Sequence, residues 1–247
     1  AAPQLPADFA VCEGDYIVLG TPTLADTYTW TGPNGFTSSL QYPAAILATL
    51  LDTGYYVLSV NVNGCGSNLD SVYVTVNPRP ATPVLSNSGP FCAGESITLY
   101  TTATCDSITW IAPDGSDTGT LANATLVVPF GSSFYQDGNW TIQCVNTTTG
   151  CVSLSSNPSN VSIDIVPVAF PTNSGPVCEG DNVTLYGNTV PGTMPGAMYS
   201  WFNDSIPRQL ISTDQNPIIG GLAAGTHNYY LVVTINSCIS DTTLTVV

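Results

Sequence analysis

The sequence NSGPFCAGESITLY at residues 87–100 recurs almost unchanged as NSGPVCEGDNVTLY at residues 173–186. A shorter version, VCEGDYIVL, occupies residues 11–19. The cysteines in the three stretches lie 80 and 86 residues apart. Similarity at a nearly fixed period is the signature of tandem structural repeats, so the chain is expected to contain three related units.

Each unit continues with the same two landmarks. The first is a tryptophan in an apolar run, and the three are Trp30, Trp110 and Trp201. The second is a strand-like segment that leads to a cysteine, at residues 56–65, 140–151 and 229–238. We expect the tryptophans to pack in the cores of the units, rather than to form a sugar-stacking surface, because all three share one position in the repeat.

Apolar residues alternate with polar ones inside the units, with the period of two that a half-buried strand requires. Turn sequences separate the strand-like runs: PNG at residues 33–35, DTG at 52–54 and PDG at 113–115. Residues 44–51 are the one stretch that could suggest a helix, and we predict a short strand and turn there. The pattern predicts an all-β chain of β-sandwiches rather than closed barrels.

Proline-rich linkers divide the chain at residues 77–83 and 166–171. The predicted domains are therefore residues 1–79, 80–167 and 168–247. Proline-stiffened linkers behave as semi-rigid spacers. The three units are expected to form an elongated rod on the order of 100 Å long, given about 3.3 Å per strand residue.

The charge of the chain excludes two classes of function. Its 247 residues contain 17 acids and only two basic residues, Arg79 and Arg208, for a formal net charge of −15. Binding to nucleic acid or to an anionic membrane surface requires clustered cations, so we expect neither kind of partner. The longest apolar stretches are far short of the roughly 20 residues that span a bilayer, so we expect no insertion into a membrane either.

All eight cysteines are expected to form disulfides, which places the protein in an oxidising, extracellular compartment. No CxxC spacing occurs, and His227 is the single histidine, so no metal site and no cofactor are expected. Alignment of the units pairs each opening cysteine with the late cysteine of its own unit. The predicted pairs are Cys12–Cys65, Cys92–Cys151 and Cys178–Cys238, with Cys105–Cys144 as an additional bridge in the second unit.

A set of motifs in the first unit resembles a known family. The motifs are CEGD at residues 12–15, YTWTGPNGF at 28–36, DTGYY at 52–56 and NGC at 63–65, followed by VNP. They resemble immunoglobulin-like repeats of very large surface proteins of Bacteroidetes-type bacteria, including gliding-motility adhesins and proteins exported by type IX secretion. The resemblance implies three tandem immunoglobulin-like β-sandwich domains at the cell surface, with adhesive, filament or stalk roles and no catalysis.

Individual polar residues do not point to an enzyme. His227 stands just before a strand-like run and is expected to be an ordinary turn residue. The acids Asp15, Glu95 and Asp181 share one position, three residues after a cysteine, and are better explained as turn hydrogen-bond acceptors than as a single catalytic carboxylate. Calcium binding at residues 114–117 is possible in principle, because carboxylate oxygens suit this ion, but it is not favoured, because the spaced ligands of a known calcium loop are missing.

The resemblance also implies O-glycosylation, since an Asp-Ser/Thr-apolar or Asp-Ser/Thr-Thr triplet is an acceptor pattern in such organisms. The candidate acceptors are Ser71, Ser107, Ser205 and Thr242. The alternative is that Asp-Ser and Asp-Thr are simply favoured turn pairs.

The function expected from the sequence is a non-catalytic structural and adhesive segment of a large extracellular bacterial surface protein, a disulfide-bonded stalk of repeats. Its partners would be neighbouring repeats of the same protein or like subunits, and an unknown surface or glycan ligand. One alternative is a subunit of a polymerised extracellular filament, joined by strand donation from residues 1–10 or by end-to-end docking. Another alternative is an accessory module of a secreted hydrolase.

Overall fold

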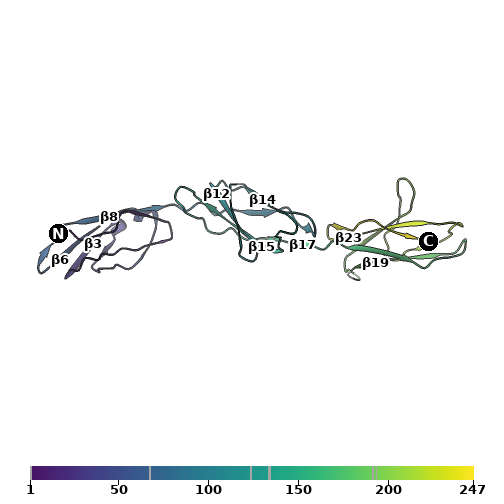
Figure 1. The fold of residues 1–247 in the computed structure, drawn as a ribbon, viewed down its shortest axis with the longest axis horizontal. Helices are drawn as coiled ribbons and strands as arrows, with labels where there is room; N and C mark the ends of the chain where they lie inside the picture. The colour runs from purple at the N-terminus through teal and green to yellow at the C-terminus, as the bar shows by residue number, and fades with distance from the viewer. Residues whose placement is uncertain (1, 67, 123, 133–134, 191, 193) are drawn as a thin grey trace.

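The computed structural model describes residues 2–247 except 67, 123, 133–134, 191 and 193. Apart from two single 3₁₀ turns, the regular elements of the described residues are all β-strands. Three β-sandwiches of immunoglobulin-like form, called repeats 1 to 3 below, follow one another along one long axis (Figure 1). This confirms the prediction of an all-β chain of three tandem sandwiches in an elongated rod. Within the described residues no helix has the length and apolarity needed to span a membrane.

Repeat 1 is built on one large sheet with strand order β1-β8-β6-β3-β4, to which β7 adds beside β6, and a separate β2–β5 pair. Its elements are β1 (Phe9–Cys12), β2 (Tyr16–Ile17), β3 (Thr27–Thr31), η1 (Pro33–Gly35), β4 (Thr37–Ser38), β5 (Ile46–Leu47), η2 (Leu50–Asp52), β6 (Gly54–Val62), β7 (Cys65–Gly66) and β8 (Asp70–Asn77). The β5 strand and the η2 turn occupy the stretch in which a short strand and turn were predicted.

Repeat 2 has sheets of order β14-β11-β9 and β13-β12-β15-β16, with a parallel β10–β17 pair. Its strands are β9 (Leu85–Asn87), β10 (Phe91–Cys92), β11 (Ile97–Thr101), β12 (Ser107–Ile111), β13 (Asp117–Leu121), β14 (Thr125–Val128), β15 (Gly138–Val145), β16 (Ser159–Val161) and β17 (Ile163–Asp164).

Repeat 3 has sheets of order β18-β19-β22 and β21-β20-β23-β24, with β25 also paired to β23. Its strands are β18 (Val168–Asn173), β19 (Val183–Val190), β20 (Met198–Phe202), β21 (Leu210–Ser212), β22 (Ile218–Ile219), β23 (Asn228–Ile235), β24 (Cys238–Ile239) and β25 (Thr243–Val246).

Each repeat has its own apolar core, and no core residue is shared between repeats among the described side chains. The tryptophans lie at the centres of these cores and are essentially inaccessible to solvent: Trp30, Trp110, Trp140 and Trp201. Burial of such large aromatic side chains dominates the stability of small sandwiches. All four tryptophans therefore act as core residues, as the shared repeat position predicted for Trp30, Trp110 and Trp201.

A buried corner contact is conserved in form between repeats 1 and 2, although the residue type changes. The Tyr56 hydroxyl donates a hydrogen bond to the Asp52 carbonyl oxygen, 3.0 Å away. In repeat 2 the Trp140 Nε1–H donates to the Gln136 carbonyl oxygen at 3.3 Å, across the same four-residue spacing. Tyrosine and tryptophan are thus interchangeable here, because each combines a large apolar ring with one polar donor.

Candidate functional site

The opening turn of each repeat holds its cysteine in the same backbone conformation. The amide N–H of the acid three residues after the cysteine donates to the cysteine carbonyl oxygen, at 2.9 to 3.0 Å in the three repeats. The glycine before each acid has a φ of +82°, +100° or +86°, in the left-handed region that favours glycine. In repeats 1 and 2 the acids Asp15 and Glu95 also accept the N–H of Cys12 and Cys92, at 3.3 and 3.0 Å. These carboxylates therefore stabilise the turn.

The opening cysteine of a repeat lies where the chain leaves that repeat. Cys12 is the register partner of Asn77 in the parallel β1–β8 pair, and Cys92 is the register partner of Asp164 in the parallel β10–β17 pair. Asn77 and Asp164 are the last residues of their repeats' final strands. In repeat 3, Cys178 and Val247 line one small surface pocket together. In repeats 1 and 2 the opening cysteine therefore faces the following repeat.

The late cysteine of each repeat lies at the opposite end, where the long strand β6, β15 or β23 finishes. In repeats 1 and 3 it begins the return strand of a tight hairpin, in which Cys65 pairs with Val62 and Cys238 pairs with Ile235. In repeat 2, Cys151 follows a longer loop and its carbonyl oxygen accepts the N–H of Asn146 at 2.9 Å. In repeats 2 and 3 the late cysteine therefore faces the preceding repeat.

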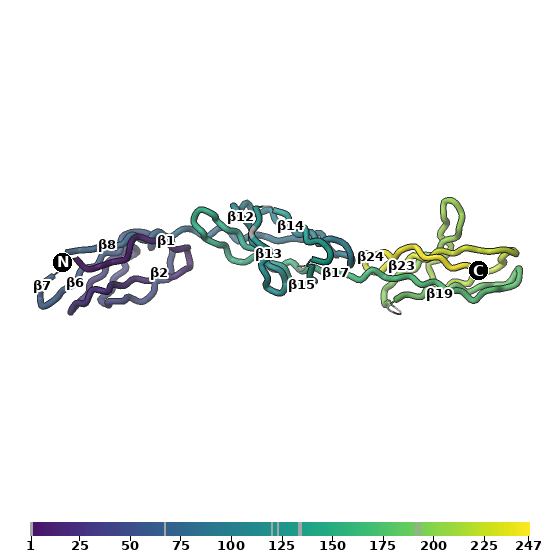
Figure 2. Tube along the Cα trace, in the orientation of Figure 1, coloured from purple at the N-terminus to yellow at the C-terminus, as the bar shows by residue number. Residues whose placement is uncertain are grey.

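Disulfides join the repeats across these junctions. Cys12 of repeat 1 is bonded to Cys151 of repeat 2, with their Cα atoms 5.6 Å apart. Cys92 of repeat 2 is bonded to Cys238 of repeat 3, with a Cα–Cα distance of 5.5 Å. Figure 2 shows the three repeats in line, so that each of these bonds crosses one joint of the rod.

These bonds contradict the predicted pairs Cys12–Cys65, Cys92–Cys151 and Cys178–Cys238. The long strand β6 begins with Gly54 at the exit end of repeat 1, and Cys65 lies beyond its other end. Nine strand residues at about 3.3 Å each place Cys12 and Cys65 roughly 30 Å apart, whereas a disulfide requires Cα atoms within about 7 Å. The same geometry separates the opening and late cysteines of repeats 2 and 3.

The other cysteines follow from this arrangement. Cys105 and Cys144 are bonded inside repeat 2, which is the additional bridge proposed from the sequence. Cys65 and Cys178 carry exposed free thiols in the part of the chain that the structure describes. Neither of them therefore forms the intrachain bond that the alignment of the repeats predicted.

An arginine reinforces the first joint. Arg79, in the linker, has its Nε–H directed at the Glu13 carbonyl oxygen of repeat 1 and its Nη2 2.5 Å from Asp15 Oδ1. Its Nη1 donates to the Val152 carbonyl oxygen of repeat 2 at 2.9 Å. A planar guanidinium can satisfy three acceptors in this way, so one side chain ties both repeats to the linker between them. This role of Arg79 was not predicted from the sequence, although the position of an arginine inside a proline-rich linker was a visible signal.

The candidate O-glycosylation residues differ in accessibility. Ser71 on β8 and Thr242 before β25 are exposed. Ser205 is half-buried, and its hydroxyl donates to Asn203 Oδ1 at 2.6 Å and lies 2.9 Å from the Pro207 carbonyl oxygen. Ser107 on β12 is only 8% exposed, so its hydroxyl is out of reach of a modifying enzyme once repeat 2 has folded.

The loop considered for calcium binding is satisfied by its own neighbours. Asp114 accepts hydrogen bonds from the hydroxyl of Ser116 at 2.5 Å and from Gln136 Nε2 at 2.7 Å. These hydrogen bonds, of which the one from the Ser116 hydroxyl has the largest effect, lower the pKa of Asp114 to about 2. No group of three or more His, Cys, Asp or Glu residues that could hold a metal ion occurs among the described residues.

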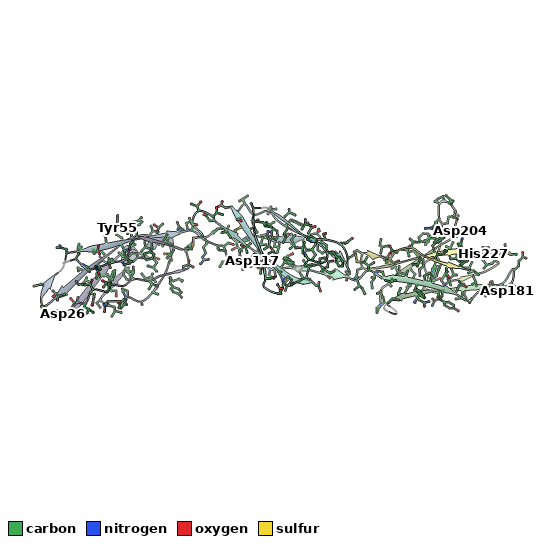
Figure 3. The ribbon with its side chains drawn as sticks, in the orientation of Figure 1. Asp26, Tyr55, Asp117, Asp181, Asp204 and His227 are labelled. Carbon is green, nitrogen blue, oxygen red and sulfur yellow. A yellow bond between two sulfur atoms is a disulfide. The ribbon has the colours of Figure 1, made fainter. Side chains whose placement is uncertain are left out.

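The single histidine lies at the C-terminal end of the rod, as Figure 3 shows. Its Nε2 is 2.8 Å from the Ala223 carbonyl oxygen, and its backbone N–H and C=O both bond to Val247. His227 therefore fixes the turn before β23, beside the end of the described chain.

Comparison with known proteins gives structural likeness but no family. No family model matches the chain, and no curated protein matches it. Among solved structures, the full ectodomain of mouse nectin-like molecule 4 (Ig1–Ig3) is 15% identical, with a TM-score of 0.43, 98% of this chain covered and 96% of that one. Immunoglobulin domains 1–4 of Sidekick-1 are 17% identical with a TM-score of 0.26, covering 100% of this chain and 72% of that one. Murine CEACAM1b is 16% identical with a TM-score of 0.34, covering 63% and 96%.

Proposed function

We propose that this chain is a non-catalytic structural and adhesive segment of a large extracellular bacterial surface protein, in which disulfide-bonded immunoglobulin-like repeats form a stalk that displays a binding end. The predicted boundaries at residues 79/80 and 167/168 delimit its three domains. The motifs of repeat 1 support a bacterial surface protein of the gliding-adhesin type, exported by type IX secretion.

One observation carries the proposal: two of the three disulfides lie across the joints between repeats. A bond inside a domain stabilises that domain, whereas Cys12–Cys151 and Cys92–Cys238 fix the angle between one domain and the next. Neighbouring domains otherwise move relative to each other by default. Fixed joints are what a spacer needs to hold a binding end at a constant distance from the cell, and disulfides persist in oxidising, extracellular surroundings.

The test is immunogold electron microscopy of the source bacterium, with antibodies raised against the folded chain. Gold particles on projections outside the outer surface support the proposal. Labelling confined to the cell interior contradicts it. A glycan array probed with the chain tests the adhesive part separately, and binding that is lost after reduction of the disulfides would favour a folded adhesive surface.

A second candidate function is a subunit of an extracellular filament, and the exposed thiols at Cys65 and Cys178 favour it. End-to-end docking suits the structure better than strand donation. The N-terminal arm is bound to its own repeat, since the Gln4 N–H donates to Thr23 Oγ1 at 2.8 Å and the Leu5 N–H donates to Asp70 Oδ2 at 3.1 Å. An arm held in this way is not free to complete a neighbouring sheet.

Glycosylation is proposed for the accessible acceptors Ser71 and Thr242, and for Ser205 if its hydrogen bonds open. The intact mass of protein isolated from the source organism tests this. A mass equal to that of the unmodified chain would contradict it.

A further inference from the structure

The two free cysteines lie at opposite ends of the rod. Cys65 opens β7, which Figure 2 shows at the N-terminal end, in the hairpin where the Asn63 N–H donates to Asp26 Oδ2 at 2.6 Å. Cys178 accepts the N–H of Asp181 at 3.0 Å through its carbonyl oxygen. Figure 3 places Asp26 at one tip of the molecule and Asp181 at the other.

Each free cysteine occupies a position that is bonded elsewhere in the same chain. Cys178 is the opening cysteine of repeat 3 and corresponds to Cys12 and Cys92, which bond to the following repeat. Cys65 is the late cysteine of repeat 1 and corresponds to Cys151 and Cys238, which bond to the preceding repeat. The three repeats therefore carry one unpaired half of a junction at each tip, and the two halves are complementary.

The cysteines that are bonded across a junction are less exposed than the free cysteines at the equivalent positions. Cys151 and Cys238 are 0% and 1% exposed at their junctions, whereas Cys65 is exposed. Cys12 and Cys92 are partly buried, whereas Cys178 is exposed. A neighbouring repeat is thus what covers these positions inside the chain, and the tips lack that cover.

We propose that copies of this chain join head to tail through a disulfide between Cys178 of one copy and Cys65 of a second copy. In each internal junction an opening cysteine meets the late cysteine of the repeat that follows, and Cys178 with Cys65 of the next copy preserves this order. A contact between two different ends of a molecule is heterologous and leaves a free end on each side, so it continues into an open filament.

The second internal junction shows that a disulfide between two repeats forms without an arginine contact like that of Arg79. Arg79 belongs to the first linker, and Arg208 lies over the ring of Tyr230, with its guanidinium carbon 3.6 Å from the ring centroid. The Cys92–Cys238 bond is nevertheless formed. A junction between two copies therefore needs the two thiols and the end surfaces of repeats 3 and 1.

Bond formation requires a two-electron oxidant, and a small-molecule disulfide such as oxidised glutathione supplies it. The thiolate of Cys178 attacks one sulfur of oxidised glutathione, forming a mixed disulfide and releasing one glutathione thiolate. The thiolate of Cys65 from the second copy then attacks the Cys178 sulfur and releases the second glutathione thiolate. Two protein thiols are oxidised to one disulfide, one glutathione disulfide is reduced to two glutathione thiols, and the thiol protons pass to them.

The test uses two single variants of the full chain, Cys65→Ser and Cys178→Ser, incubated with a mixture of reduced and oxidised glutathione at high protein concentration. Each variant alone should stay monomeric on a non-reducing gel. Their equimolar mixture should give one species of doubled mass that disappears on reduction, because each partner supplies one thiol and growth stops at the dimer. The unsubstituted chain should give a ladder of multimers.

Peptide mapping after pepsin digestion at low pH, which suppresses disulfide exchange, identifies the bond. A peptide containing Cys178 linked to one containing Cys65 is expected in the mixture. Covalent dimers of either variant alone, or a mixture that stays monomeric, would overturn the proposal.

The same mapping on protein from the source organism separates a second copy from a further repeat of a longer chain. Cys178 linked to Cys65 supports the proposal, and Cys178 linked to a sequence outside these 247 residues overturns it. The inference rests on the filament candidate; if it fails, the stalk proposal is untouched, since the stalk depends on the two internal junctions.

Discussion

Cys92 and Cys238 lie 146 residues apart in the sequence and are joined by a disulfide, with their Cα atoms 5.5 Å apart. The bond connects the opening turn of repeat 2 to the hairpin that follows β23 in repeat 3. Because the opening and late cysteines of a repeat lie at opposite ends of a strand of about 26 Å, neither of the two could have found its partner inside its own repeat.

Trypsin provides a direct check of this bond. The Arg79–Pro80 bond is a poor trypsin site, which leaves Arg208 as the one good site in the chain. In a Cys178→Ser variant the fragments 1–208 and 209–247 should stay together on a non-reducing gel, because Cys92 still holds Cys238. In a Cys92→Ser variant they should separate. The opposite pattern would restore the pair Cys178–Cys238.

Removal of the first junction bond should weaken two repeats and spare the third. When repeat 2 is folded, Cys151 lies next to the linker, because Arg79 in the linker donates to the carbonyl oxygen of the adjacent Val152 at 2.9 Å. The disulfide to Cys151 therefore keeps Cys12 close to the linker even when repeat 1 unfolds. The disulfide thus closes the unfolded chain of repeat 1 into a loop, which lowers its conformational entropy. It closes the unfolded chain of repeat 2 in the same way when repeat 1 is folded. On the chain-entropy argument, the double variant Cys12→Ser/Cys151→Ser should lose about 2–4 kcal/mol of unfolding free energy in each of these repeats.

Hydrogen exchange followed by mass spectrometry checks this repeat by repeat. Faster exchange in the strands of repeats 1 and 2, with repeat 3 unchanged, is expected. The matched control is Cys105→Ser/Cys144→Ser, which removes a bond spanning 39 residues within repeat 2 and should weaken that repeat alone. If both double variants increased exchange equally in all three repeats, the prediction that each bond stabilises only the repeats it joins would be wrong.

Arg79→Ala should increase bending at the first joint while leaving both flanking sandwiches folded. The Arg79–Asp15 pair is partly exposed, so its contribution to stability is about 1 kcal/mol or less. Its contacts instead fix the orientation of the linker. Small-angle X-ray scattering should show a broader distribution of end-to-end distances, and Arg79→Lys should restore only part of the stiffness because an ammonium lacks the guanidinium's planar fork. An unchanged distribution for Arg79→Ala would leave the disulfide as the sole restraint.

The stability of repeat 1 should fall at high pH because of Tyr56. Burial, with a further contribution from the charge of Asp52, raises the pKa of the Tyr56 hydroxyl to about 12 in the folded chain. A raised folded pKa stabilises the protein below the unfolded value near 10, and this stabilisation is lost as the pH rises from about 10 through 12. Thermal unfolding of the oxidised chain between pH 9 and 12 measures the loss, and a Tyr56→Phe variant should flatten this part of the profile. Identical profiles for the two proteins would rule out Tyr56 as the source.

The sequence predicted the sandwiches well because their determinants are local. Alternating apolar residues, turn sequences and a tryptophan at a fixed repeat position need no knowledge of how distant strands pair. The three tryptophans at that position, Trp30, Trp110 and Trp201, are accordingly buried in the cores of the three repeats.

The pairing of the cysteines could not be predicted in the same way. Alignment of the repeats shows which cysteines occupy equivalent positions, but it does not show at which end of the sandwich each position lies. That depends on the parallel pairing of β1 with β8, which brings Cys12 beside Asn77. Parallel neighbours are distant in sequence, so this placement leaves no periodic signal in the chain.

The junction bonds also determine how the rod responds to a pulling force. Three segments of the chain connect the Cys12–Cys151 bond to the Cys92–Cys238 bond: residues 12–92, 92–151 and 151–238. The Cys105–Cys144 bond bypasses most of the second segment. The shortest covalent path from end to end therefore uses only about 40 residues, about 140 Å when fully stretched. The folded rod is on the order of 100 Å long by strand length, so full stretching lengthens it by about 40%. Under tension the oxidised protein is a tether of limited extensibility, in which the load passes through sulfur atoms before any sandwich can unravel completely.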